Sequence, residues 1–134
     1  MTAQRIVTIA AVAAVAGAVV AAFLMIGSPQ RVRTEAIDER RLRGLGDIAS
    51  DLYNAHRHTS APLPAKIDRT ETDPITGDPY EYRRLGPLAY ELCADFALPT
   101  PASRADRDVT AFWHHTAGHY CYRFDVRNDV PSTL

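Results

Sequence analysis

The fold is decided by a short stretch near the middle of the chain, Asp73-Pro74-Ile75-Thr76-Gly77-Asp78-Pro79-Tyr80-Glu81-Tyr82-Arg83. Its first part predicts a tight turn, because proline fixes φ and keeps the preceding residue extended, while glycine tolerates positive φ. Its second part predicts a strand, because Tyr80 and Tyr82 fall on one face and Glu81 and Arg83 on the other. The chain after the turn is therefore expected to form a small antiparallel sheet.

Three segments have the alternation of strands, at residues 79–84, 88–96 and 119–126. The second and third each place one face of aromatic and aliphatic side chains against one polar face, so we expect three antiparallel strands with an aromatic side. Residues 97–118, between them, are long for a plain loop. This segment contains Phe112 and Trp113. These two side chains are predicted either to contact a protein partner, as aromatic residues often do at interfaces, or to close one end of the core.

An uncharged apolar segment runs through residues 6–26. At 1.5 Å per residue a helix of this length spans about 31 Å, the thickness of a bilayer hydrocarbon core. It predicts one transmembrane helix that is retained. The alternative is a cleaved signal peptide with Arg5 as its basic region, but the apolar segments of signal peptides are usually shorter and no small-residue cleavage site follows.

A second helical pattern covers residues 32–56. One face is predicted to be apolar and the opposite face to carry Asp38, Arg43, Asp47 and Asp51. The sheet is the expected partner of the apolar face, so the fold class is α+β, with an N-terminal transmembrane helix and an amphipathic helix packed on a three-stranded antiparallel sheet. The expected organisation is an anchor at residues 1–30, an α+β domain at 31–128 and a flexible tail at 129–134.

Cys93 and Cys121 both fall on the polar face of their strands. If these strands are antiparallel neighbours, the two side chains lie opposite each other at a separation that a disulfide accepts. We therefore predict a Cys93–Cys121 bridge, with two free thiols as the alternative. A disulfide implies an oxidising compartment and hence an exported domain. The arginines argue for the opposite orientation, because five follow the apolar segment before residue 44 and only Arg5 precedes it.

Motifs for metal binding are weak. His115 and His119 have the spacing of two helical metal ligands, but the glutamate of a zinc-protease motif is missing. Cys93, Cys121 and His119 lack the spacing of structural zinc sites, and the oxygens of Asp73, Thr76 and Asp78 are explained by turn formation without calcium. No metal, no cofactor and no catalytic residue is predicted. The formal net charge of −1 gives no reason to expect nucleic acid as a partner.

The layout resembles the pseudopilins of type II secretion systems. The matching residues are Leu52-Tyr53, Leu63-Pro64 and Asp73-Pro74-Ile75-Thr76-Gly77-Asp78-Pro79-Tyr80-Glu81-Tyr82. Since no acidic residue precedes Glu35, the resemblance implies the fold more than membership of a secretion filament. We expect a non-enzymatic, single-pass protein of the bacterial inner membrane whose periplasmic domain binds a protein partner. The alternative is an accessory subunit of a larger respiratory or transport complex in the membrane.

Overall fold

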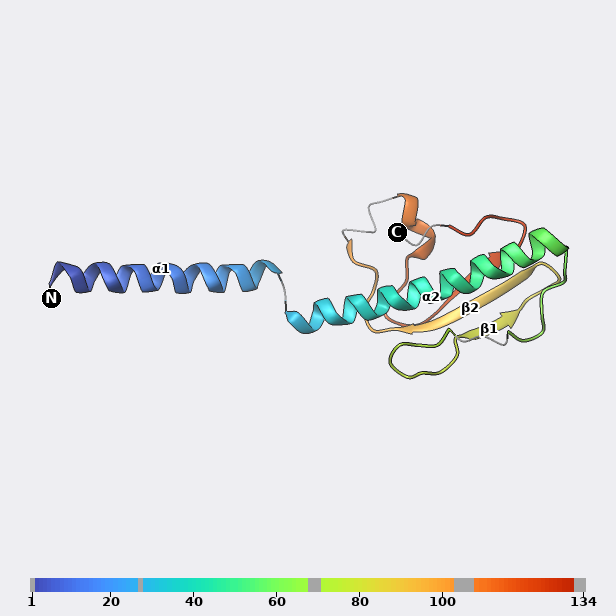
Figure 1. The fold of residues 1–134 in the computed structure, drawn as a ribbon, viewed down its shortest axis with the longest axis horizontal. Helices are drawn as coiled ribbons and strands as arrows, with labels where there is room; N and C mark the ends of the chain where they lie inside the picture. Colours follow the sequence, from blue (N-terminus) through green and yellow to red (C-terminus); the bar gives the residue numbers. More distant parts are fainter. Residues whose placement is uncertain (1, 27, 68–70, 103–107, 132–134) are drawn as a thin grey trace. The chain divides into compact units, whose positions relative to one another are not determined.

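The computed structural model describes residues 2–26, 28–67, 71–102 and 108–131. The chain divides into two compact units, residues 1–33 and 34–134, whereas the sequence placed the end of the anchor at residue 30. The first unit contains helix α1, Ala3–Ile26, and the start of helix α2, Pro29–Thr59. The second contains the rest of α2, three strands and a short 3-10 helix (Figure 1).

Helix α1 has 24 residues and no acidic side chain. None of its most apolar window is buried within the molecule, and Leu24 and Met25 are more than four-fifths exposed, at 81% and 86%. Its length of about 36 Å exceeds the thickness of a bilayer core. The sequence prediction of one helix long and apolar enough to cross a membrane is confirmed.

Helix α2 extends beyond the predicted residues 32–56 at both ends. Ser28 caps its start, since its hydroxyl accepts the amide of Arg31 at 3.3 Å, and Pro29 stands at the first helical position, where its missing N–H costs nothing. Thr59 ends the helix, and Ser60 adopts a positive φ of 52° while its amide donates to the carbonyl of His56. The Ser28-Pro29 step therefore begins this helix.

The sheet is antiparallel with the order β1-β2-β3, as predicted. Strand β1 is Glu81–Arg84, β2 is Ala89–Phe96 and β3 is Gly118–Asp125. The register aligns Glu81 with Cys93 and Cys93 with Cys121. The turn before β1 also forms as expected: Thr72 pairs with Pro79 in an isolated bridge, and Gly77 has a φ of 75°.

Helix α2 lies along the sheet (Figure 1), and its apolar side chains pack on the aromatic face of the sheet. Leu45, Ile48 and Ala49 of the helix are fully buried, and the hydroxyl of Tyr90 on β2 donates to the carbonyl of Ala49 at 3.4 Å. The remaining core side chains are Leu42, Leu52, Leu63, Tyr80, Leu92, Ala94, Phe96, Trp113, Tyr122, Phe124 and Val126. The sulfur atoms and most charges of the strands therefore lie on the opposite face.

Two segments outside the strands differ from the expectation. Residues 97–118 contain the 3-10 helix η1, Asp108–Trp113, which the sequence did not predict. The predicted flexible tail begins with ordered contacts, because Val130 packs against the core and the carbonyl of Pro131 accepts a hydrogen bond from the indole of Trp113 at 2.9 Å. The end of the tail, residues 132–134, lies outside the described residues.

Candidate functional site

Both cysteines of the chain lie on the outer face of the sheet, at paired positions of β2 and β3. Their sulfur atoms are 2.07 Å apart, the length of a disulfide bond, and their Cα atoms are 4.0 Å apart. Such a short Cα separation belongs to the positions of an antiparallel pair that do not exchange backbone hydrogen bonds. The bridge that the strand alternation predicts is therefore present. It links β2 and β3 covalently on the face of the sheet that points away from α2.

Polar side chains surround the bridge. The Nε2 atom of His119 lies 3.6 Å from the sulfur of Cys121 and 3.6 Å from a carboxylate oxygen of Glu81, while its Nδ1 atom lies 3.3 Å from a carboxylate oxygen of Asp95. We call Glu81, Cys93, Asp95, His119 and Cys121 the disulfide cluster. Cys93 is buried, whereas His119 is more than half exposed. The cluster thus combines two sulfurs, one imidazole and two carboxylates at the surface.

Glu91 lies one row further along the same face and is almost completely buried, at 2% exposure. Arg83 donates to its Oε1 through both Nε and a terminal nitrogen, and Arg123 approaches its Oε2 at 3.6 Å. A buried carboxylate between two arginines is compensated in charge, so it needs no external cation. We assign this group to the stability of the sheet.

A second buried group of charges joins α2 to the loops. Asp38, which the sequence placed on the solvent face of the helix, is 5% exposed, and Arg41 is 7% exposed. Arg41 donates to Asp38 at 2.9 Å and, through two nitrogens, to both oxygens of Asp73 at 2.5 and 3.2 Å. The assignment of Asp38 to the polar face was wrong, because Asp38 also accepts the backbone amides of Ala97 and Leu98 at 3.1 and 2.9 Å.

This network shifts the ionisation of its members. The hydrogen bonds from Arg41, aided by the backbone amides of Ile75 and Thr76, lower the pKa of Asp73 to about 2. The same contact with Asp73 raises the pKa of Arg41. Asp73 and Arg41 therefore stay charged at neutral pH, and the oxygens of Asp73 are occupied by donors. The interpretation of Asp73 as a turn residue rather than a calcium ligand agrees with this arrangement.

Phe112 and Trp113 occupy different environments. Trp113 is 2% exposed and accepts a hydrogen bond on its carbonyl from the hydroxyl of Tyr122 at 2.9 Å, so it belongs to the core. Phe112 is 37% exposed and meets the indole ring edge-to-face at 5.2 Å. Of the two residues predicted to contact a partner, Trp113 is buried in the core and Phe112 presents surface. Partner binding at Phe112 stays a prediction.

His115 and His119, whose spacing would suit two metal ligands on one helix, do not lie on a helix together. His119 is part of strand β3, and His115 lies before this strand, outside any helix. The ring of His115 stacks on Phe96 with a centroid distance of 3.8 Å. Burial of this imidazole lowers the pKa of His115. His115 is therefore a neutral core residue. Among the described residues, the group whose donor atoms lie close enough to hold a metal is Cys93, His119 and Cys121, all within 4.8 Å.

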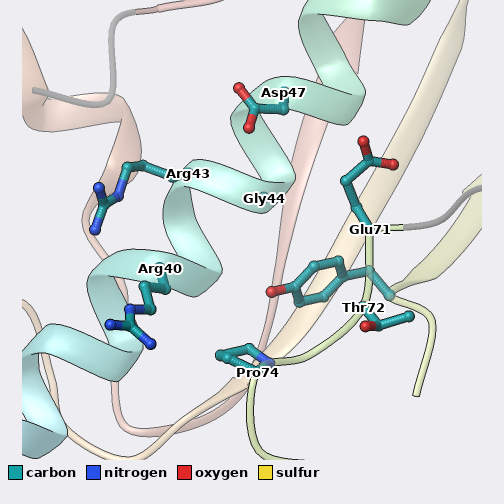
Figure 2. A pocket seen from close by; sticks show the side chains of 8 residues that line it. Arg40, Arg43, Gly44, Asp47, Glu71, Thr72 and Pro74 are labelled. Carbon is teal, nitrogen blue, oxygen red and sulfur yellow. The ribbon is translucent and has the colours of Figure 1, made fainter. Parts of the chain in front are cut away.

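A hollow of about 340 Å³ opens between α2 and the segment that leads into β1. Figure 2 shows Arg40, Arg43 and Asp47 on the helix, with Glu71, Thr72 and Pro74 opposite. Ligand pockets are lined mainly by apolar and aromatic side chains, whereas half of the residues that line this hollow are charged, with both signs present. The lining of this hollow therefore gives no reason to propose a particular class of ligand.

The sequence predicted the cysteine pair and pointed to His119 only as a weak zinc ligand, and it did not single out Glu81 and Asp95 as neighbours of the bridge. Glu81, Asp95 and His119 lie on the same strand face as the cysteines, so the period of two already placed them there. For Arg41 no such signal exists, because its partner Asp73 is distant in the sequence. Comparisons with protein-family models, curated proteins and solved structures find no match for this chain.

Proposed function

We propose that this chain is a single-pass, membrane-anchored module of the bacterial inner membrane, non-enzymatic, with a pseudopilin-like domain in the periplasm that binds a protein partner. The observation that carries the proposal is α1, because 24 residues without an acidic side chain, unburied in their most apolar window, need an apolar environment that the chain itself does not supply. An interaction module is favoured over an enzyme because the cysteines are bonded to each other, so neither supplies a thiolate nucleophile.

The periplasmic orientation is supported by the cross-strand disulfide, which is typical of domains in oxidising compartments. The arginines argue for the opposite orientation, because Arg31, Arg33, Arg40 and Arg43 are exposed on the early part of α2 and only Arg5 precedes the apolar segment. We give the disulfide more weight, because it requires an oxidising compartment to persist.

The pseudopilin-like part of the proposal is supported by the placement of its motif. Leu52 and Leu63 are buried in the core between α2 and the sheet, and the Asp-Pro turn leads directly into β1. These residues thus connect one long helix to a small antiparallel sheet, which is the layout that the resemblance implies.

The second candidate is an accessory subunit of a larger membrane enzyme complex. Ala13, Gly17 and Ala21 follow one another at intervals of four residues on α1, and a Cβ placed on Gly17 would meet no atom within 4 Å. Small residues at this spacing allow close packing of two membrane helices. A Gly17→Leu variant is expected to lose co-purification with the complex in mild detergent, whereas Val15→Leu, on another side of the helix, should keep it.

The primary proposal is tested on the full chain expressed in bacteria with a C-terminal tag. The protein should remain in membranes after alkaline carbonate extraction, and protease added to intact spheroplasts should degrade the domain. Val15→Arg should release a large fraction, because arginine in the centre of a spanning helix costs about 3 kcal/mol, whereas Val15→Leu should not. Recovery of the wild type in the soluble fraction would refute the anchor, and protection until the cells are lysed would refute the orientation.

A further inference from the structure

We propose that the disulfide cluster is a redox-controlled zinc site: when the Cys93–Cys121 bond is reduced, the two thiolates, the Nε2 atom of His119 and the carboxylate of Glu81 bind one Zn²⁺. This inference goes beyond the membrane-anchored function and does not depend on it. It rests on how the register brings these donor atoms together on one face of the sheet.

The donors come from three adjacent strands. Glu81, Cys93 and Cys121 form one row of paired positions across β1, β2 and β3, and Asp95 and His119 form the next paired position of β2 and β3. Every side chain of the cluster points to the same face, because the residues are separated by even numbers along each strand. The backbone of the sheet thus holds the donors before any metal arrives.

The distances fit tetrahedral zinc. With bonds of about 2.3 Å to sulfur and about 2.0 to 2.2 Å to nitrogen and oxygen, neighbouring ligand atoms lie about 3.3 to 3.8 Å apart. The Nε2 atom of His119 is 3.6 Å from the sulfur of Cys121 and 3.6 Å from the carboxylate of Glu81. Two thiolates, one imidazole and one carboxylate are ligands that Zn²⁺ accepts. To bind zinc, the two sulfur atoms must still move apart, from the length of a disulfide bond to the spacing of two separate ligands.

Asp95 would orient the histidine ligand without binding the metal itself. Its carboxylate lies 3.3 Å from the Nδ1 atom of His119, and a proton on Nδ1 leaves Nε2 free to bind the metal. A histidine ligand held by a carboxylate in this way is typical of zinc sites. Asp95 is therefore assigned as a positioning residue.

The switch follows from the chemistry of sulfur. In the disulfide each sulfur is uncharged and bonded to the other, so neither acts as a thiolate ligand. A thiol or phosphine reductant opens the bond: for a phosphine, one molecule of water supplies the oxygen of the phosphine oxide and the two protons of the new thiols. Zn²⁺ then displaces both protons as it binds, which makes the affinity fall as the pH is lowered.

The test uses the full chain in detergent micelles, reduced with a phosphine and titrated with Co²⁺ as a coloured substitute for Zn²⁺. The reduced wild type should bind one equivalent with thiolate charge-transfer bands and the strong visible bands of tetrahedral Co²⁺. Competition with a chromophoric chelator then gives the zinc affinity. The oxidised wild type should show neither signal.

Variants separate the site from adventitious binding. In the reduced state, His119→Ala and Glu81→Gln should each weaken zinc binding at least tenfold, and Asp95→Asn about tenfold through the imidazole. His58→Ala, which removes an exposed histidine of α2, should change nothing. Near-ultraviolet circular dichroism follows folding in the same samples. If reduction weakens this signal, zinc should restore it.

Four results would overturn the inference. One is a reduced wild type without tetrahedral thiolate bands, and another is an affinity that His119→Ala leaves unchanged. The third is a near-ultraviolet signal that reduction weakens and zinc does not restore. Binding of equal strength to the oxidised and reduced chains would also contradict it, because the bonded sulfurs have no part in such a site.

Discussion

Arg41 and its partner Asp38 together connect three separate parts of the fold. Arg41 bonds Asp38 on its own helix and Asp73 in the turn before β1, and Asp38 in turn receives the amides of Ala97 and Leu98 just after β2. A buried charge is tolerated only when it is paired and hydrogen-bonded. Each member of this network therefore depends on the others.

Replacing Arg41 with methionine should lower the free energy of unfolding by about 3 kcal/mol, because the buried carboxylate of Asp38 and the partly buried carboxylate of Asp73 lose their cation. Urea unfolding followed by the fluorescence of Trp113, the single tryptophan of the chain, measures the loss. Arg43→Met removes an exposed arginine two positions away and should stay within about 0.5 kcal/mol of the wild type. Equal effects of the two substitutions would argue against the network.

The low pKa of Asp73 predicts a loss of stability in acid. Its folded pKa of about 2 lies below the ordinary value of 3.8, so the contribution is complete above about pH 4 and disappears as the pH falls towards 2. The shift corresponds to about 2 kcal/mol. Asp125, whose pKa Arg127 also lowers to about 2, titrates in the same window. The difference between wild type and Asp73→Asn, measured from pH 5 to pH 2, isolates Asp73; parallel curves would contradict its role.

At the scale of the elements, the sequence patterns predicted most of the domain. Alternation located the three strands and their aromatic face, and the Asp-Pro turn located the start of the sheet. The helical period predicted α2 but misplaced Asp38, because a helical wheel describes one helix and contains no information about the loop amides that pack against it. The 3-10 helix η1 was missed for a related reason, since short helices are set by tertiary contacts such as those of Trp113.

Gly44 shows a close approach between two elements. A Cβ atom at this position of α2 would lie 2.9 Å from a ring carbon of Tyr80. Gly44→Ala should lower the free energy of unfolding by about 1 kcal/mol, because the overpacking of about 2 kcal/mol exceeds the gain of about 1 kcal/mol in helix propensity. Gly86→Ala, where no atom lies within 4 Å, is the matched control. A more stable Gly44→Ala protein would show that the ring of Tyr80 moves aside freely.

The disulfide acts between β2 and β3, across a sequence separation of 28 residues. The double variant Cys93→Ala/Cys121→Ala should unfold with a free energy about 3 to 4 kcal/mol lower than that of the oxidised wild type. Chemical denaturation measures the difference, and added reductant should have no further effect on the variant. A loss well below 1 kcal/mol would mean that the strands hold their register without the bridge.

At the scale of the whole molecule, the division into two units predicts an independent domain. A fragment of residues 34–134 should be soluble without detergent, contain the disulfide and give the near-ultraviolet spectrum of the full chain, because every residue of the hydrophobic core lies within it. Size-exclusion chromatography and circular dichroism test this expectation. A fragment that aggregates or lacks the spectrum would show that the first unit contributes to folding.

The candidate site was less predictable than the fold. The sequence indicated the disulfide through the matching faces of two strands, and the same rule would have placed His119, Glu81 and Asp95 beside it. It did not predict that these side chains approach within hydrogen-bonding or metal-ligand distances, because rotamers and strand twist decide the last few ångströms.

The network of Arg41 and its partners, which joins α2 to the segment just after β2, also has a mechanical consequence. Along the chain, Asp38 and Arg41 come before every core residue, so tension applied through the N-terminal helix would reach their charged contacts first. Those contacts cross from the helix to two other segments and would share the load between them. The polar network, and not the apolar core behind it, would then set the force at which this domain begins to yield.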